Sequence, residues 1–358
     1  MQKNKTIWVV LRSHLITLPP VMTVIDCLLN TEEYNVKLVS TKETEINHPL
    51  FEEFIITQTH KVGVAKKISN YYFFRKFVQK TFTEKLKEDD LVWIASLDTA
   101  QACKGLNFLN TNKYILQLHE LYDTYPRKLE SIKLIAQKAY KVVVPEPNRA
   151  GILQVWLKLK KRPFILPNKP LNHPRKKYLE PTTVQTKNAI EKYWRNKPII
   201  IYQGHISSDR NLMPIAEAMK SLEDYDFWLL GLDHGYVDKL LNTSNNIFYL
   251  GNFTPPYHLE LTSYANIGIM SYDLVNLNNL YCAPNKVWEY SGFGIPFIAN
   301  NCLGLNDSSL KGAGICIDLE VEIIIDKVSN LNIKDLEEKS NEYYESINMF
   351  SLIKDLVS

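Results

Sequence analysis

The sequence predicts an α/β protein built from two doubly wound, Rossmann-like domains. Apolar runs of strand length alternate with longer amphipathic patterns along most of the chain, the order that produces parallel sheets covered by helices. A chain of 358 residues also exceeds what one hydrophobic core usually supports. From Arg162 the sequence predicts a last strand of the first domain and then, up to Lys177, a stretch rich in proline and lysine that is the best linker candidate. We expect domains at 1–172 and 173–335 and a C-terminal helix at 336–358.

Composition narrows the functional classes. The net charge is only +3, so the total charge gives no footprint of nucleic-acid binding. The five cysteines have no metal-ligand spacing, which is typical of reduced, mostly buried thiols. No apolar run approaches the roughly 20 residues of a membrane span, and the first one is interrupted by Arg12 and His14. We expect a cytoplasmic protein without a metal or another cofactor.

The first domain contains the first group of polar candidates. Its strands are predicted at 6–11, 36–40, 54–57, 91–95, 114–118 and 141–145, with a helix at about 21–30. Ligands bind at the carboxyl ends of such strands, where His14 follows the first strand and His119 and Glu120 follow the fifth. Successive side chains at a strand end point in opposite directions, so only one of His119 and Glu120 should face a ligand. A lone histidine is also often structural, and this alternative stays open.

The second domain repeats the pattern. Its strands are predicted at 198–203, 226–231, 247–251, 267–270, 295–299 and 314–317. Gly204 follows the first of them and permits close approach of the backbone to a ligand. Arg210, near the next helix start, can pair with two oxygens of a diphosphate, although an arginine on a solvated helix end is an equally open interpretation.

The stretch 281–300 reads as loop, helix, turn and strand. Pro284 suits the first helical position, and Asn285 and Lys286 then place backbone donors and a cation at the helix start, which favours an anion. Glu289, one turn later, projects from the same side of the helix. A phosphate at the helix start with a carboxylate that accepts from ribose hydroxyls would hold a nucleotide sugar. Common scaffolding also contains such helices, so the residues alone leave both interpretations open.

This stretch resembles the donor motif of family 4 of the retaining glycosyltransferases of the GT-B fold, Pro-x-Lys-x-x-Glu-Tyr-x-x-x-Gly-x-Pro. The matching residues are Pro284, Lys286, Glu289, Tyr290, Gly294 and Pro296. The resemblance implies two domains that face a central cleft, with the acceptor bound by the first, the nucleotide-sugar donor by the second, and the last helix crossing back. Family members often have a further glutamate where this chain has Tyr281, which leaves the donor sugar open.

The resemblance also implies roles for individual residues. The predicted donor-binding residues are Gly204, Arg210, Asn252, Phe253, Asn285, Lys286 and Glu289. Asn252 and Phe253 would edge the nucleobase with one polar and one stacking contact. His119 and Glu289 are assigned to catalysis, His119 because the family has a histidine beside the donor sugar at the corresponding position. His14 and Glu120 are assigned to the acceptor.

Two other stretches allow more than one interpretation. Residues 61–88 are dense in aromatic and basic residues, and as a helix they predict either peripheral contact with anionic lipid or a sheet-covering helix with a solvated basic face. Nucleic-acid binding is a weaker alternative. Asp224 and Asp226 spell the Asp-x-Asp of the other glycosyltransferase fold, but they precede a strand instead of following one, so no metal site is predicted.

The predicted function is transfer of a hexosyl-type sugar from a nucleoside-diphosphate sugar, UDP- or GDP-linked, to a glycan or lipid-linked acceptor. The family resemblance implies retention of configuration and a role in bacterial capsule, exopolysaccharide or lipopolysaccharide assembly at the inner face of the membrane. Without a metal, Arg210 and Lys286 would stabilise the leaving diphosphate. A nucleotide-sugar epimerase of the same fold and a non-catalytic binding module, favoured by Tyr281, remain alternatives.

Overall fold

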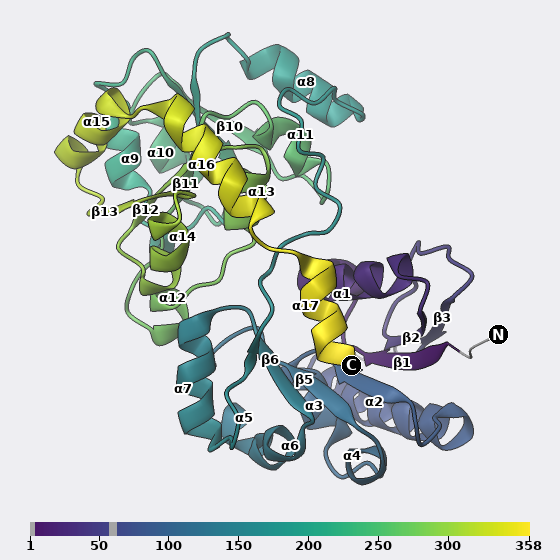
Figure 1. Ribbon diagram of the computed structural model, residues 1–358. Helices are drawn as coiled ribbons and strands as arrows, with labels where there is room; N and C mark the ends of the chain where they lie inside the picture. Colours follow the sequence, from purple (N-terminus) through teal and green to yellow (C-terminus); the bar gives the residue numbers. More distant parts are fainter. Residues whose placement is uncertain (1–3, 57–62) are drawn as a thin grey trace. The chain divides into compact units, whose positions relative to one another are not determined.

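Two separately packed units make up the computed structural model, which describes residues 4–56 and 63–358 (Figure 1). Unit 1 comprises Met1–Leu171 and Asn348–Ser358, and unit 2 comprises Asn172–Ile347. The first passage between units comes one residue before the predicted boundary at 172. The chain returns to unit 1 at Asn348, whereas the sequence predicted a helix that crosses back from 336. Helix α16 (Ile333–Glu345) therefore lies in unit 2, and α17 (Met349–Val357) lies in unit 1.

The sheet of unit 1 has seven parallel strands within the described residues, in the order β3-β2-β1-β4-β5-β6-β7. Their bounds are β1 (Lys5–Val10), β2 (Tyr34–Ser40), β3 (Phe51–Ile55), β4 (Leu91–Ile94), β5 (Tyr114–Gln117), β6 (Lys141–Val144) and β7 (Phe164–Ile165). The strand order reverses between β1 and β4, so the carboxyl ends of these strands flank the place where such sheets bind ligands. Strand β3 begins at Phe51, three residues before the predicted start.

Helices cover both faces of this sheet. They are η1 (Leu15–Thr17), α1 (Pro19–Asn30), α2 (Gly63–Lys85), α3 (Leu97–Cys103), α4 (Phe108–Thr111), α5 (Pro126–Ser131), α6 (Lys133–Lys138), α7 (Pro147–Leu157) and α17. Helix α17 contacts α1, although the two are far apart in the sequence (Figure 1).

Helix α2 occupies most of the basic and aromatic stretch predicted at 61–88. Its residues Phe74, Val78 and Phe82 are buried, as a sheet-covering helix requires, whereas Tyr72 and Phe73 are exposed. Residues 61 and 62 lie outside the described part of the chain. The described side chains therefore fit the structural interpretation, and two exposed aromatic rings remain for contact with a lipid surface.

Unit 2 contains a second parallel sheet, with six strands among the described residues, in the order β10-β9-β8-β11-β12-β13. Their bounds are β8 (Ile199–Gln203), β9 (Asp226–Leu230), β10 (Ile247–Gly251), β11 (Ile267–Met270), β12 (Phe297–Asn300) and β13 (Gly314–Ile317). The order reverses between β8 and β11, which again flank the expected ligand position. Strand β12 begins two residues later than predicted, after Pro296.

The helices of unit 2 are shorter on average than those of unit 1, and α13 carries the motif identified in the sequence. They are α8 (Val184–Tyr193), η2 (Ser208–Arg210), α9 (Met213–Ala218), α10 (Val237–Leu241), α11 (His258–Thr262), α12 (Leu277–Leu280), α13 (Lys286–Gly292), η3 (Leu303–Leu305), α14 (Asn306–Leu310), α15 (Val321–Asn330) and α16.

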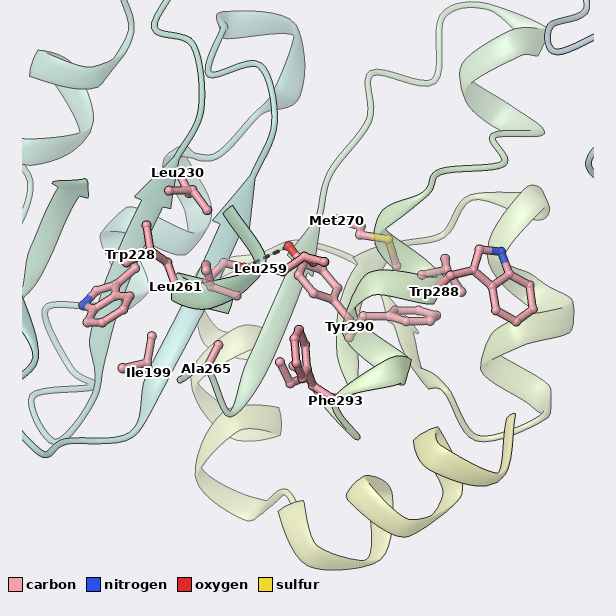
Figure 2. Packing of buried hydrophobic residues seen from close by; sticks show 14 of the residues in the cluster. Ile199, Trp228, Leu230, Leu259, Leu261, Ala265, Met270, Trp288, Tyr290 and Phe293 are labelled. Atoms are coloured by element: carbon pink, nitrogen blue, oxygen red, sulfur yellow. Dashed lines mark hydrogen bonds between the residues drawn. The ribbon is translucent and has the colours of Figure 1, made fainter. Parts of the chain in front are cut away.

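Tyr290 anchors α13 to the sheet of unit 2. Figure 2 shows its ring within the buried cluster that includes Met270 and Phe293. The ring packs on β11 at Gly268, where an added Cβ would lie 2.3 Å from the ring, so only glycine fits. The Tyr290 hydroxyl lies 3.4 Å from the carbonyl oxygens of Ile201 in β8 and Ile269 in β11. One fully buried side chain thus fixes α13 against the two strands at which the strand order reverses.

Candidate functional site

Helix α13 begins at Lys286, with Asn285 as the residue that precedes its first turn. The carbonyl of Asn285 accepts from the backbone N–H groups of Trp288 and Glu289, at 2.9 and 3.1 Å. Pro284 therefore lies before the helix and not at its first position, which corrects the sequence prediction. Val287 and Tyr290 are buried as predicted.

Lys286 and Arg210 form a pair of cations beside two tyrosines. The Lys286 ammonium lies 4.4 Å from the ring centre of Tyr202, and the Arg210 guanidinium lies 5.1 Å from that of Tyr272. Burial and the nearby charge of Arg210 lower the pKa of Lys286 to about 7. Among the residues that the structure describes, Nη1 of Arg210 has no hydrogen-bond partner, although it is buried. A bound anion would therefore reduce the repulsion between the two cations and accept a hydrogen bond from Nη1 of Arg210.

Gly204 brings the loop after β8 next to Lys286. Its φ is +132°, in the region that favours glycine, and an added Cβ would lie 3.2 Å from the Lys286 amine. Its N–H donates to the carbonyl of Leu230 at 2.8 Å, so this amide serves the sheet. A second glycine, Gly231 after β9, is required for the same close packing, because its Cβ would lie 1.9 Å from the carbonyl oxygen of Gly204.

Glu289 is held by residues that the sequence pattern did not identify. The side-chain amide of Gln203, at the carboxyl end of β8, donates to one carboxylate oxygen, and Nε2 of His258 lies 3.5 Å from the other. The hydroxyl of Thr262 in turn donates to Oε1 of Gln203 at 2.6 Å. Burial would raise the pKa of Glu289, but attraction to His258 and Lys286 outweighs it and holds the pKa below its ordinary value. The carboxylate is therefore ionised and oriented before any ligand arrives.

Gln203 could have been found from the sequence, because it is the last residue of a predicted strand in a fold that binds ligands there. His258 gives no comparable indication. It is the first residue of α11, after a loop from β10 whose path the sequence does not define. Within the described part of the chain, its Nδ1 is buried without a hydrogen-bond partner.

A segment at the start of unit 2 fastens the other end of α13. Nε2 of His173 donates to the carbonyl of Glu289 at 3.0 Å, because Nδ1 accepts from the N–H of Arg175. Burial lowers the pKa of His173 to about 4, so the ring is neutral. Nε of Arg175 donates to the carbonyl of Gly292 at 2.7 Å, which occupies another carbonyl at the helix end. Gly292 itself has no room for a Cβ, which would lie 2.6 Å from the His173 ring.

The loop after β8 also carries a histidine pair. Nδ1 of His205 and Nε2 of His234 are 2.8 Å apart, and both side chains are exposed. Burial of the ring atoms, His234 and Arg210 lower the pKa of His205. Its ring is therefore a neutral hydrogen-bonding group and not a third cation.

The predicted nucleobase contacts differ in accessibility. Asn252 is exposed, whereas Phe253 is 6% exposed and belongs to the apolar core of unit 2. Phe253 thus has little ring surface for a stacking base. In the structure, its ring packs in the hydrophobic core of unit 2.

In unit 1, His119 lies two residues beyond the carboxyl end of β5, which ends at Gln117. Its Nε2 donates to the carbonyl of Ala95 at 2.8 Å, and burial lowers its pKa to about 4. Buried Arg149 donates to the backbone carbonyl of His119. The ring is neutral, and its Nδ1 is the nitrogen that can accept a hydrogen bond. Glu120 is exposed.

His14 lines a separate hollow of unit 1. This hollow has a volume of about 740 Å³ at the carboxyl ends of β1, β2 and β3. Arg12 and Ser13 also line it, and Arg12 is paired with Asp98 in the first turn of α3. The position agrees with the predicted acceptor role, which remains a prediction.

The sequence also predicts that the chain has neither a metal site nor a membrane-spanning segment. In the residues that the structure describes, no cluster of three or more His, Cys, Asp or Glu side chains is arranged to hold a metal ion. Asp226 begins β9, where it is buried and paired with Arg195. The five cysteines are free, and four of them are buried. Across positions 4–56 and 63–358, no helix combines the length and the apolar character needed to cross a membrane.

Comparisons with known proteins identify the fold. Neither a scan against protein-family models nor a search of curated proteins gives a match. Sucrose-phosphate synthase from Thermosynechococcus elongatus is similar over 99% of this chain and 97% of its own, with TM-score 0.72 and 14% identity. HepE of Anabaena, solved with UDP and glucose, is similar over 98% and 97%, with TM-score 0.71 and 11% identity. WaaG, a glycosyltransferase involved in lipopolysaccharide biosynthesis, is similar over 98% of both chains, with TM-score 0.65 and 13% identity. The chain has the GT-B fold.

Proposed function

We propose that this chain is a glycosyltransferase that transfers a sugar from a nucleoside-diphosphate sugar to a glycan or lipid-linked acceptor. The observation that carries the proposal is the grouping of Lys286, Arg210 and ionised Glu289 at the carboxyl ends of β8 and β11. A diphosphate needs cations and a ribose needs hydrogen-bond acceptors, and this arrangement supplies both within one unit.

In this proposal, Lys286 and Arg210 stabilise the diphosphate as it leaves the sugar. Negative charge grows on the leaving oxygen as the glycosidic bond breaks. Lys286, with its pKa near 7, becomes fully protonated when the diphosphate approaches, and Nη1 of Arg210 gains the acceptor that it lacks. These two residues supply the positive charge without a metal ion in the mechanism that we propose.

Glu289 and His119 take the other predicted roles. The Glu289 carboxylate accepts hydrogen bonds from ribose hydroxyls, because Gln203 and His258 hold it in place and leave it partly accessible. His119 presents Nδ1 as an acceptor for a sugar or acceptor hydroxyl. Asn252 is offered to the nucleobase, and His14 and Glu120 to the acceptor.

The finer assignments rest on resemblance. The motif in α13 is similar to that of family 4, which implies a hexosyl-type transfer with retention of configuration. HepE was solved with UDP and glucose, which supports a UDP-linked donor, with GDP as the other candidate. WaaG is involved in lipopolysaccharide biosynthesis, and the likeness to it supports a role in bacterial surface-polysaccharide assembly. A cytoplasmic location with peripheral membrane contact through α2 is part of the same proposal, and exposed Tyr72, Phe73 and Lys76 are the side chains available for it.

A second candidate is a non-catalytic module that binds a nucleotide sugar. Tyr281 favours it, because the family often has a glutamate at this position. Such a module would bind the donor with the same Lys286, Arg210 and Glu289, and it would leave the glycosidic bond intact.

Incubation with a panel of UDP- and GDP-sugars distinguishes the two. A transferase slowly releases free sugar and nucleoside diphosphate when water replaces the acceptor. We expect release from one donor, and its loss in Lys286→Gln. Binding of a donor without release over long incubation would support the non-catalytic module instead.

A further inference from the structure

A basic hollow lies at the amino-terminal ends of β6 and β7 in unit 1. Its volume is about 600 Å³, and it is lined by the end of α6, the start of β6 and the segment between α7 and β7. Four cationic residues line it, namely Lys141, Lys160, Lys161 and Arg162. His119 follows the carboxyl end of β5, which pairs in parallel with β6. The hollow lies at the amino-terminal ends of the strands and is therefore separate from the predicted catalytic and acceptor residues.

The lining of the basic hollow, as far as the structure describes it, contains no acidic residue. No aspartate or glutamate occurs in the sequence from position 147 to 179. Another hollow of unit 1, with a volume of about 720 Å³, is lined by Lys87 next to Glu88 and therefore has compensated charge. The concentration of one sign of charge thus distinguishes the basic hollow from a hollow of similar size on the same unit.

Two of the four cations are positioned by neutral groups. The Lys141 amine donates to the carbonyls of Asp355 and Leu356 in α17, and Nη2 of Arg162 donates to the carbonyl of Pro147 at 2.9 Å. In the part of the chain that the structure describes, none of the four lies in a salt bridge. Lys160, Lys161 and Arg162 are all exposed. Like charges around one hollow repel each other, and a multiply charged oxyanion relieves this repulsion.

We propose that the basic hollow binds a phosphate-bearing ligand. Arg162 offers the planar fork that matches phosphate oxygens, and the lysines add flexible point charges. The phosphate would come either from the headgroup of an anionic lipid or from a soluble phosphate compound. This site is independent of the diphosphate site proposed in unit 2.

The test uses two probes and one matched pair of variants. Lys160→Gln, Lys161→Gln and Arg162→Gln are combined in a hollow variant. Lys220→Gln, Lys239→Gln and Lys327→Gln, all exposed on unit 2, are combined in a control that loses the same charge. The first probe is vesicles of phosphatidylcholine with and without phosphatidylglycerol. The second is inorganic pyrophosphate, titrated in an Arg210→Gln, Lys286→Gln background so that the proposed donor site cannot contribute.

We expect the hollow variant to lose affinity for at least one probe while the control keeps it. The loss is on the order of a hundredfold for vesicles with phosphatidylglycerol, from three basic residues near the surface, and at least about tenfold for pyrophosphate. Loss on vesicles alone assigns a lipid headgroup, and loss on pyrophosphate alone assigns a soluble phosphate compound. Loss on both probes also supports the site.

The proposal is overturned if the parent chain does not bind the vesicles and the Arg210→Gln, Lys286→Gln background does not bind pyrophosphate, or if the hollow variant and the control bind each probe equally. Should the triple change impair folding, as judged by circular dichroism, the double variant Lys160→Gln, Lys161→Gln replaces it, because both side chains are exposed. These outcomes do not depend on the donor site, since the background already lacks its two cations.

Discussion

The two units prepare their candidate site residues in opposite ways. In unit 2, Lys286, Arg210 and Glu289 are charged or poised to become so, and neighbouring side chains hold Glu289 before a ligand binds. In unit 1, His119 is kept neutral by burial, and Arg12 is already paired with Asp98. In our proposal, the donor site of unit 2 therefore recognises charge, and the site around His119 in unit 1 recognises hydroxyl groups by neutral hydrogen bonds.

Glu289→Ala removes a charged residue of the proposed donor site in unit 2. Of the single variants proposed here, we expect it to cause the largest loss of donor affinity. The change removes a charged acceptor for two hydroxyls, worth roughly 2–3 kcal/mol or about a hundredfold. Calorimetric titration with the nucleoside diphosphate measures it. Glu322→Ala, an exposed glutamate on α15, is the matched control and should bind like the parent. Unchanged affinity in Glu289→Ala would remove the ribose assignment.

The pH dependence of donor binding tests the cation pair. Lys286 has its pKa lowered to about 7, so above that pH the amine loses the proton that a diphosphate needs. Binding then takes up a proton, and affinity should fall by up to about tenfold for each pH unit above 7. Arginine stays protonated over this range, so Lys286→Arg should retain binding and flatten the profile. A parent profile that is flat from about pH 6 to about pH 9 would contradict the lowered pKa.

His173→Phe tests whether the hydrogen bond from His173 to the Glu289 carbonyl in α13 contributes to donor binding. Phenylalanine keeps a ring against Phe293 but cannot donate to the Glu289 carbonyl. We expect donor affinity to fall about fivefold, the value of one hydrogen bond. His173→Gln, which restores a donor, should recover part of it. Equal affinity in the phenylalanine variant and the parent would confine His173 to packing.

His119→Asn should have the smallest effect on donor affinity and a clear effect on turnover. Because we propose the donor site in unit 2, the dissociation constant of the nucleoside diphosphate should not change. Turnover should fall about a hundredfold or more if Nδ1 handles a reacting hydroxyl. Because its pKa is near 4, turnover should not depend on His119 protonation at neutral pH. A variant with weaker donor binding and normal turnover would reverse the division of roles between the units.

The sequence predicted the architecture well, because alternating strands and helices are written in local hydrophobic patterns. It also predicted donor-binding roles for Lys286, Glu289 and Arg210 from a motif and a strand end, and these roles stay predictions. It missed Gln203, although the place of this residue at the end of a predicted strand could have indicated it. It also missed His258, His173 and His234, since these act through contacts between segments far apart in sequence. It misjudged the environment of Phe253 for a related reason, because the burial of a loop aromatic depends on the packing of its neighbours. The start of α13 was misplaced because the choice of first residue depends on backbone geometry that Pro284 alone does not determine.

Recognition of a nucleoside diphosphate by unit 2 depends, in our proposal, on Lys286 and Arg210. Titration calorimetry with UDP and with GDP, in the presence of a chelator, measures this dependence. We predict saturable binding of one nucleotide by the parent chain, and at least about a hundredfold weaker binding when Lys286→Gln and Arg210→Gln are combined. Binding that appears only after manganese is added, or that the double variant retains, would contradict the proposal.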